Sequence, residues 1–394
     1  MKFLSFFFNN PLFEGFIYWI KTLWFLWVPL FLIFLFCKSW VARLRGRYLK
    51  NLRWQLLEIK LPREIYKSPR AMEVVLNAFH QTRDGNLINK YWEGFLRAWF
   101  SLEIAGIDGN VHFFVRTQRF FRNLVEAQFY AQYPDIEIVE VEDYTRAAHF
   151  EDMEEWNMWG AEFGLTNDDA FPIRTYTDYG LHETITKEEQ KTDPLTSVLE
   201  FLGSLKHGEQ VWYQFILRAT KKDWKAEGKK AIGKILGVSP EASLEEKSQA
   251  MSGLSSGQKE MIKAVERNIS KLGFDVVTRG MYIARRDVFD FVNVVSLMGV
   301  MKQYNALDLN GFKPVNSTVV DYFFKKRRSA RKKRIKLNAF RNRGSFYYPY
   351  VYSSFVLNSE ELATVYHFPG RVAETPTFGR IEAKKSEPPA NLPV

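Results

Sequence analysis

The chain has 394 residues, 46% apolar and 25% charged, a composition typical of a folded protein. Its only cysteine is Cys37, which excludes a disulfide framework and a cysteine-ligated metal site. The net charge of +10 is concentrated in two blocks, because residues 38–53 hold six Lys or Arg and residues 325–336 hold nine, while the remainder is net acidic. Each block therefore needs its own explanation.

The first predicted element is a membrane-spanning helix over residues 16–37, preceded by a short outer segment, residues 1–15. Twenty-two helical residues rise about 33 Å, close to the thickness of a bilayer's hydrocarbon core. Positive charge follows this run instead of preceding it, and no small-residue cleavage site is present, which argues against a secretory signal peptide. Aromatic side chains around the whole helix argue against a buried helix of a soluble protein.

A basic juxtamembrane segment, residues 38–53, follows the span and contains no acidic residue. Because positive charge accumulates on the cytoplasmic side of membranes, we expect a single-pass protein of the inner membrane, with its N-terminus outside and its main body in the cytoplasm. The residues expected to meet anionic lipid headgroups are Lys38, Arg43, Arg45, Arg47, Lys50 and Arg53.

Residues 54–170 are predicted to form a first α+β module with an acidic connector. Alternating apolar residues predict strands at 55–61, 100–104, 111–115 and 136–141, and helical stripes predict helices at 68–81 and 120–132. Asp108-Gly109 predicts a tight hairpin. This order, β-α-β-β-α-β, is that of a ferredoxin-like module. Within the connector, Trp156, Trp159 and Phe163 stand at helical spacing and predict a connecting helix.

A second module of similar order is predicted over residues 171–320. Strands are expected at 173–178, 211–217 and 274–285, with one helix opening at Asp193-Pro194 and another at 288–301. A polar helical insert, residues 221–271, interrupts it, with two capping boxes that begin at Ser243 and Ser255. The predicted fold class is therefore α+β: one transmembrane helix followed by ferredoxin-like α/β sandwich modules, two in number, with a helical insert.

No motif predicts an active site. Gly228 to Lys234 matches most of a phosphate-binding loop, but Ile235 stands where a Ser or Thr would hold Mg²⁺, so a lysine-rich helix or turn is favoured. Gly253 to Gly257 matches G-x-S-x-G, yet Ser255 already serves as a helix cap. The six histidines are scattered; His149 lies near four acidic residues, for which a solvated acidic helix is favoured over a cation site. We expect no cofactor, no metal and no enzyme activity.

The second basic block, residues 325–336, lies within a basic and aromatic segment, residues 321–382. It could neutralise nucleic-acid phosphates, with the aromatic residues beyond it stacking on bases. An anionic lipid surface and an ordinary solvated or partner-facing loop are the alternatives. The candidate residues are Lys325, Lys326, Arg327, Arg328, Arg331, Lys332, Lys333, Arg334 and Lys336.

Two stretches, DPLTSVLEFLGSLKHGEQVWYQFILRA (193–219) and VLNSEELATVYHFPG (356–370), together with the closing EAKKSEPPANLPV, carry a family resemblance. The chain from Gln55 onward resembles the N-terminal, membrane-anchored, non-motor region of HerA/FtsK-type DNA-pumping ATPases and of type IV secretion ATPases of bacteria. In such proteins a Pro-rich segment like residues 383–394 leads into the motor. The resemblance implies a motor domain on a separate chain or one lost by truncation, and a homo-oligomer that matches a ring.

These observations predict a membrane-anchored, non-catalytic adaptor in a type IV secretion or conjugation-like DNA-translocating system. It would tether a ring ATPase to the cytoplasmic face of the lipid bilayer and contact DNA through residues 325–336. The alternative is a membrane-bound scaffold or anionic-lipid-surface protein with no nucleic-acid role. An enzyme of unknown chemistry is a third hypothesis, which ATP hydrolysis sensitive to Lys234→Ala would support.

Overall fold

A computed structural model describes residues 19, 21–62, 65, 67–182, 192–239, 243–321 and 323–370. The chain divides into two compact units. The first comprises Met1–Leu52 and Asp84–Arg97, and the second comprises Arg53–Arg83 and Ala98–Val394. The predicted outer segment and Pro-rich tail lie outside the described residues.

The first unit is built on α3, a helix of 28 residues, Trp24–Asn51. Among the described residues it is the one helix long and apolar enough to cross a membrane. The helix continues past Cys37 to Asn51, so the basic juxtamembrane stretch is helical except for its last two residues. Pro29 lies inside α3 and Leu44 is its buried residue. The other part of this unit is a loop, residues 84–97, with a single helical turn, η1 (Asn89–Glu93).

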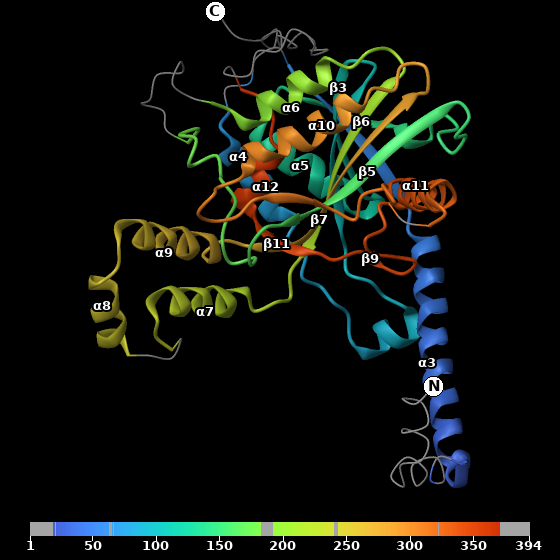
Figure 1. Cartoon of the computed structure of the whole chain (residues 1–394), viewed down its shortest axis with the longest axis horizontal. Coiled ribbons are helices and arrows are strands. Elements are labelled where there is room, and N and C mark those ends of the chain that lie inside the picture. Colours follow the sequence, from blue (N-terminus) through green and yellow to red (C-terminus); the bar gives the residue numbers. More distant parts are fainter. Residues whose placement is uncertain are drawn as a thin grey trace, which may run out of the picture. The chain divides into compact units, whose positions relative to one another are not determined.

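The second unit contains a nine-stranded antiparallel sheet and a separate two-stranded hairpin (Figure 1). The strands are β1 (Trp54–Lys60), β2 (Phe100–Ile107), β3 (Asn110–Gln118), β4 (Glu137–Val141), β5 (Trp156–Leu165), β6 (Glu209–Ala219), β7 (Gly273–Arg285), β8 (Phe312–Val315), β9 (Phe346–Tyr347), β10 (Tyr350–Val351) and β11 (Phe355–Asn358).

Helices connect and cover these strands. They are α4 (Pro69–Ala78), α5 (Arg122–Gln132), α6 (Pro194–Gly203), α7 (Trp224–Leu236), α8 (Leu244–Ser252), α9 (Ser256–Ile269), α10 (Phe291–Val300), α11 (Lys325–Asn342) and α12 (Ser359–Val365), with 3₁₀ turns η2 (Arg119–Phe121), η3 (Tyr144–Arg146) and η5 (Met301–Tyr304).

The strand order is β4-β1-β3-β2-β6-β7-β5-β8, with β11 also paired to β7. The β2–β6 pair divides this path into two halves, one with β1 to β4 and the other with β5 to β8. From the centre outwards, the strands of the first half are β2, β3, β1 and β4, and those of the second half are β6, β7, β5 and β8, so the two halves have the same order. The hairpin between β2 and β3 turns at Asp108 and Gly109, both at positive φ, as predicted. The predicted strands and helices of residues 54–141 are confirmed within a few residues.

The first strand of the second half was predicted in the wrong place. Residues 156–165 form β5, which pairs with β7 and β8, and not the predicted connecting helix. Residues 173–178 form no strand, because side chains take up their backbone N–H groups: the amide of Ile173 donates to Glu361 and that of Tyr176 donates to Thr364. The later predicted elements, α6, β6, β7 and α10, are confirmed.

The sheet is covered on both faces. One face carries the larger core, formed with α4, α5, α6, α10 and α12, to which Leu57 and Phe113 contribute. The opposite face carries a smaller core in which Leu56, Phe114 and Trp212 pack against Leu337 and Phe340 of α11. Adjacent residues 56 and 57 serve different cores because successive strand side chains point to opposite faces.

The predicted helical insert is present as α7, α8 and α9, which Figure 1 shows set apart from the sheet. Both predicted capping boxes are formed, Ser243 with Glu246 and Ser255 with Gln258. Gly228 lies where α7 packs on α9, and a Cβ there would stand 2.3 Å from Ile269. The glycine therefore serves helix packing.

Candidate functional site

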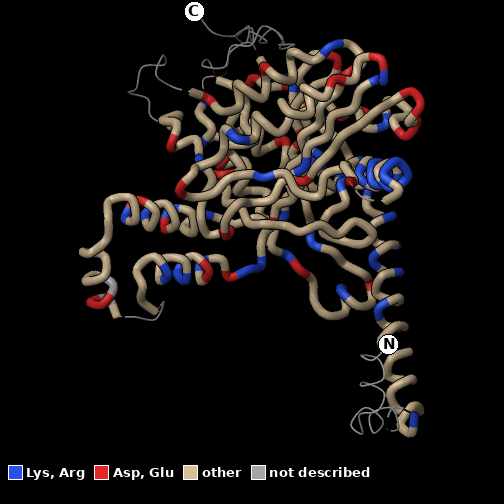
Figure 2. Tube along the Cα trace, viewed as in Figure 1, with Lys and Arg blue, Asp and Glu red and all other residues tan. Residues whose placement is uncertain are grey.

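The second basic block forms the N-terminal part of α11 (Figure 2). Most of its cations are exposed, namely Lys325, Lys326, Arg327, Arg328, Arg331 and Arg334. Lys332 and Lys333 are partly buried, and Lys336 is buried. The block therefore forms one cationic surface on α11, and its last lysine, Lys336, points into the protein interior.

Lys336 holds α11 against the sheet and is not part of the exposed candidate surface. Its ammonium donates to Glu162 of β5. Burial lowers the pKa of Lys336, and the Glu162 carboxylate counteracts part of that effect. One turn earlier, Lys333 donates to Asn157 over 2.7 Å, and Ser329 donates to the carbonyl of Thr318 over 3.2 Å. This side of α11 is therefore fastened to β5 and the segment before the helix.

A buried ionic cluster holds the other end of α11. Arg343, directly after the helix, donates to both carboxylate oxygens of Glu103 on β2, each over 2.8 Å. The Ser101 and Tyr144 hydroxyls also donate to Glu103, at 2.6 and 2.7 Å. Burial opposes the charge of Glu103, but Arg343 and these donors hold its pKa below the ordinary value. Asp143 accepts from the remaining side of Arg343.

A second buried arginine lies beside this cluster. Arg279 of β7 donates to Gln214 over 2.9 Å and to the carbonyl of Gly344 over 3.2 Å. Burial lowers the pKa of Arg279 to about 10, so its guanidinium stays charged at neutral pH. Together with Arg343, it ties the end of α11 to the sheet and leaves the cationic half exposed.

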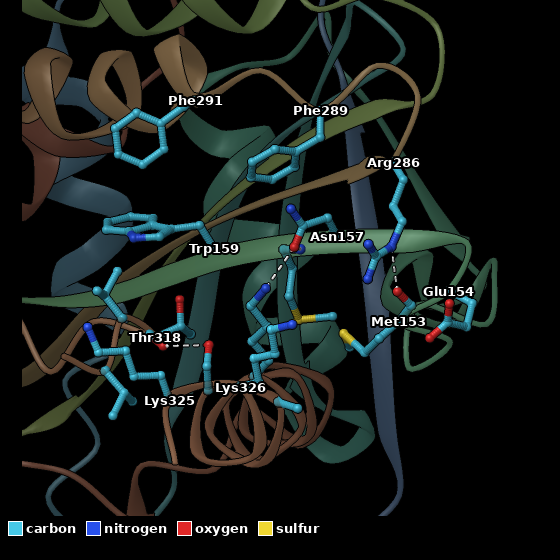
Figure 3. Close-up of a pocket in the computed structure, with 16 residues that line it drawn as sticks. Met153, Glu154, Asn157, Trp159, Arg286, Phe289, Phe291, Thr318, Lys325 and Lys326 are labelled. Carbon is cyan, nitrogen blue, oxygen red and sulfur yellow. Dashed lines mark hydrogen bonds between the residues drawn. The ribbon is translucent and has the colours of Figure 1, made fainter. Parts of the chain in front are cut away.

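A cleft of about 730 Å³ opens beside the exposed half of α11 (Figure 3). Three other segments complete it: β5, the turn that leads from β7 into α10, and residues 318–320. Its cationic lining comes from Lys325, Lys326, Lys333 and Arg286, and its aromatic lining from Trp159, Phe289 and Phe291; Glu154 is its acidic residue.

The charges of this cleft favour an anion. Arg286 donates to the carbonyl of Met153 over 2.6 Å, which fixes its guanidinium at one end. Burial lowers the pKa of Lys333, and the neighbouring charge of Arg286 lowers it further. An anion between these two groups would relieve that repulsion and favour the charged lysine. Figure 3 shows Phe291, Phe289 and Trp159 on one side of the cleft and Lys325 and Lys326 of α11 on the other.

The aromatic residues of the cleft are not those that the sequence singled out. Of the residues after the basic block, Phe340 and Phe355 are buried and Phe346 stacks on Arg218, with 4.2 Å between the guanidinium and the ring centre. The aromatic side chains that line the cleft come instead from β5, from the turn before α10 and from the start of α10. Phe291 is the most accessible of them, with 64% of its surface exposed.

The other motifs found in the sequence have structural roles. Gly228 to Lys234 lies inside α7 and forms no phosphate loop, and Ser255 caps α9. The acidic residues near His149 lie in turns, not in the predicted helix. Within the described ranges no group of three His, Cys, Asp or Glu side chains is placed to hold a metal ion. The six juxtamembrane cations are all exposed.

Comparison with known protein families matches residues 50–380 to DUF8128, a domain of unknown function. The chain belongs to the DUF8128 family. No curated protein matches the chain. The DUF8128 region includes the complete sheet, the helical insert, α11 and the cleft, and it begins at the last residues of α3.

Proposed function

We propose that this DUF8128 protein is a membrane-anchored, non-catalytic adaptor that binds nucleic acid through α11 and the adjoining cleft. In this proposal α3 spans the inner membrane with the N-terminus outside, and the second unit lies in the cytoplasm. The apolar run in the N-terminal part of α3 and the exposed cations after that run support this arrangement. They equally suit contact of the juxtamembrane segment with anionic lipid.

The observation that carries the nucleic-acid proposal is the convergence of cationic and aromatic side chains on one cleft. Lys325 and Lys326 face a cleft whose opposite wall carries Phe291, which is exposed, and Trp159, which is largely buried. Cations alone would suit any polyanion, but aromatic faces beside them also suit unpaired bases. We therefore favour single-stranded over double-stranded nucleic acid, since stacked, paired bases present no face to these rings.

The proposed partner is a ring ATPase, in keeping with the resemblance to the non-motor region of HerA/FtsK-type and type IV secretion ATPases. We further propose that each half of the large sheet is a ferredoxin-like module. The support is the order of elements: in each half two helices alternate with four strands, α4 and α5 in the first and α6 and α10 in the second. A homo-oligomer that matches the ring completes the proposal.

The test is the salt dependence of binding to a fluorescent single-stranded oligonucleotide. Each phosphate contact contributes a slope of about −0.7 to log K against log salt for single strands. Replacing Lys325, Lys326 and Arg327 with Ala should weaken binding and flatten the slope by about two. Replacing Phe291 with Ala should weaken binding about 5- to 150-fold at one salt concentration and leave the slope unchanged, because stacking is worth about 1–3 kcal/mol per base.

The matched control replaces three exposed lysines of the helical insert, Lys225, Lys229 and Lys230, with Ala. This variant loses the same net charge and should bind like the parent protein. If the α11 variant also binds the oligonucleotide like the parent, the proposed binding of nucleic acid through α11 is wrong. If the parent binds vesicles of anionic lipid through α11 and an oligonucleotide does not compete, the protein is a lipid-surface scaffold instead.

A further inference from the structure

The loop formed by residues 84–97 leaves the second unit between α4 and β2 and joins the first unit, beside α3. The two ends of the loop are held together, because Asp84 at its start pairs with Arg97 at its end, with 3.5 Å between Nε and Oδ1. Asp84 also accepts a hydrogen bond from Lys90. At the start of the helical turn, the backbone N–H of Asn86 donates to the side chain of Asn89 over 3.1 Å. The backbone N–H of Asn89 donates to the side chain of Asn86 over 2.8 Å. The loop is therefore ordered by its own contacts.

The loop is docked on α3 at a defined level. Gly94 has a φ of +71° and lies so close to the helix that a Cβ there would stand 2.5 Å from the carbonyl carbon of Leu44. Phe95 packs edge-on against Tyr48, with 5.7 Å between ring centres. Figure 1 shows the helical turn beside α3. Only glycine permits both this conformation and this approach.

The helical turn carries four large apolar side chains that are exposed. Leu87 is 73% exposed, Ile88 66%, Tyr91 52% and Trp92 72%. The spacing of these residues, i, i+1, i+4 and i+5, places them together on one side of the turn. The charged groups of the loop have partners within it, since Asp84 pairs with Lys90 and Arg97 and the Glu93 carboxylate accepts a hydrogen bond from Asn89 over 2.6 Å. An apolar patch of this kind on an ordered loop marks an interaction surface.

The position on α3 identifies the occupant. Leu44 lies about 10 Å along the helix from Cys37, the last residue of the apolar run, and the headgroup region of a leaflet is about 5–8 Å deep. The loop is therefore attached at the edge of the bilayer's interfacial region. Tyr and Trp are the residues enriched there, because their rings are apolar and their N–H or O–H groups remain in contact with polar groups.

We propose that residues 87–92 form an interfacial anchor that inserts Leu87, Ile88, Tyr91 and Trp92 into the headgroup region beside α3. It rests on the proposed membrane span of α3, and it does not require nucleic acid or a ring ATPase. A second contact with the bilayer would fix the rotation of α3 about its axis, which a single span leaves undefined. The juxtamembrane cations Arg43 and Arg47, both exposed, would meet lipid phosphates at the same level.

The test uses single cysteines labelled with a polarity-sensitive fluorophore in the full chain, reconstituted into vesicles of phosphatidylcholine and phosphatidylglycerol. Four proteins are compared: the parent, labelled at Cys37, and three variants in which Cys37→Ser is combined with Leu87→Cys, Trp92→Cys or Leu307→Cys. Leu307 is the control, a fully exposed apolar residue of the second unit. Spin-labelled lipid is then added as a quencher.

Labels at positions 87 and 92 should emit at shorter wavelength than the label at 307 and should lose fluorescence when spin-labelled lipid is present. If Cys37 is quenched while positions 87 and 92 behave like 307, the span stands and the interfacial anchor is wrong. If Cys37 is not quenched, the span itself fails, and with it the proposed membrane anchoring. If the patch binds a soluble protein partner instead of lipid, Cys37 should be quenched and positions 87 and 92 should behave like position 307.

Discussion

At the scale of single residues, the most informative feature is a buried charge pair at the end of α11, away from the exposed cations of that helix. Arg343 and Glu103 are both fully buried and lie 240 positions apart in the chain. A buried ion pair is weak evidence for stability when compared with an apolar pair, but removal of one partner leaves an uncompensated charge. This pair therefore specifies where the end of α11 meets the sheet.

Glu103→Gln should lower the free energy of unfolding by about 3–5 kcal/mol at neutral pH, because Arg343 would lose its fully buried carboxylate partner and keep the partly exposed Asp143. The measurement is urea denaturation of the detergent-solubilised protein, followed by tryptophan fluorescence. The control is Glu126→Gln, which breaks the surface pair with Arg122 and should cost about 1 kcal/mol or less. Equal stability of the two variants would contradict the role given to the buried pair.

The same residue predicts the direction of the pH dependence. The folded-state pKa of Glu103 lies below its ordinary value, so its contribution is complete above the unfolded-state pKa of about 4.3. That contribution is lost as the pH falls through the lower folded-state pKa. The stability difference between the parent protein and Glu103→Gln should therefore be constant from neutral pH down to about 5 and shrink only in stronger acid. A difference that shrinks above pH 6 would assign the effect to another group.

At the scale of elements, α6 shows how a cap is shared between distant segments. Asp193 accepts from the backbone N–H of Leu195 over 2.8 Å and contacts Nε2 of His367 over 3.1 Å. The first bond satisfies the helix N-terminus, and the second connects α6 to the segment after α12. Both groups are buried, so the carboxylate supports two elements at once.

Asp193→Ala should lower the free energy of unfolding by about 1–3 kcal/mol, since it removes the cap and leaves the His367 ring without this partner. Asp193→Asn keeps a cap acceptor and should recover about 1 kcal/mol of that loss. Thermal unfolding followed by circular dichroism compares the three proteins. If the Asn variant were no more stable than the Ala variant, the cap would not be the source of the effect.

The local signals in the sequence predicted most elements but missed β5, and the reason is physical. Both faces of β5 are covered: Trp156 and Met158 enter one core, while Trp159 and Phe163 enter the other. A strand buried on both faces shows no alternation of polar and apolar residues, and its large side chains happened to stand at helical spacing. The error placed the start of the second half of the sheet too late in the chain.

The candidate site was predictable only in part for a related reason. The basic run was visible as a run because its residues are adjacent in sequence. The aromatic wall was not, since Trp159 and Phe291 reach the cleft from β5 and from the start of α10, which long-range strand pairing brings together. The interfacial patch was hidden similarly: Leu87 and Trp92 have meaning only once Gly94 docks the loop on α3.

At the scale of the whole molecule, the two basic blocks have different expected roles, and topology separates them. The orientation rule counts Lys and Arg within about 15–20 residues of a membrane span. Only the juxtamembrane block, on and just beyond the C-terminal half of α3, meets that condition; the α11 block lies nearly 300 residues further on. The first block should therefore set the orientation and the second should not affect it.

Fusions after Val394 test this in a bacterial host. We expect a fluorescent protein fused there to fluoresce and alkaline phosphatase fused there to be inactive, because the proposed orientation places the body in the cytoplasm. Replacing Lys38, Arg43, Arg45, Arg47, Lys50 and Arg53 with Gln should raise phosphatase activity, since the bias that holds this end inside is removed. Replacing the six exposed cations of α11 with Gln removes the same charge and should leave the phosphatase inactive. If both variants raised phosphatase activity equally, net charge would matter more than its distance from the span. An active phosphatase in the parent fusion would place the body outside.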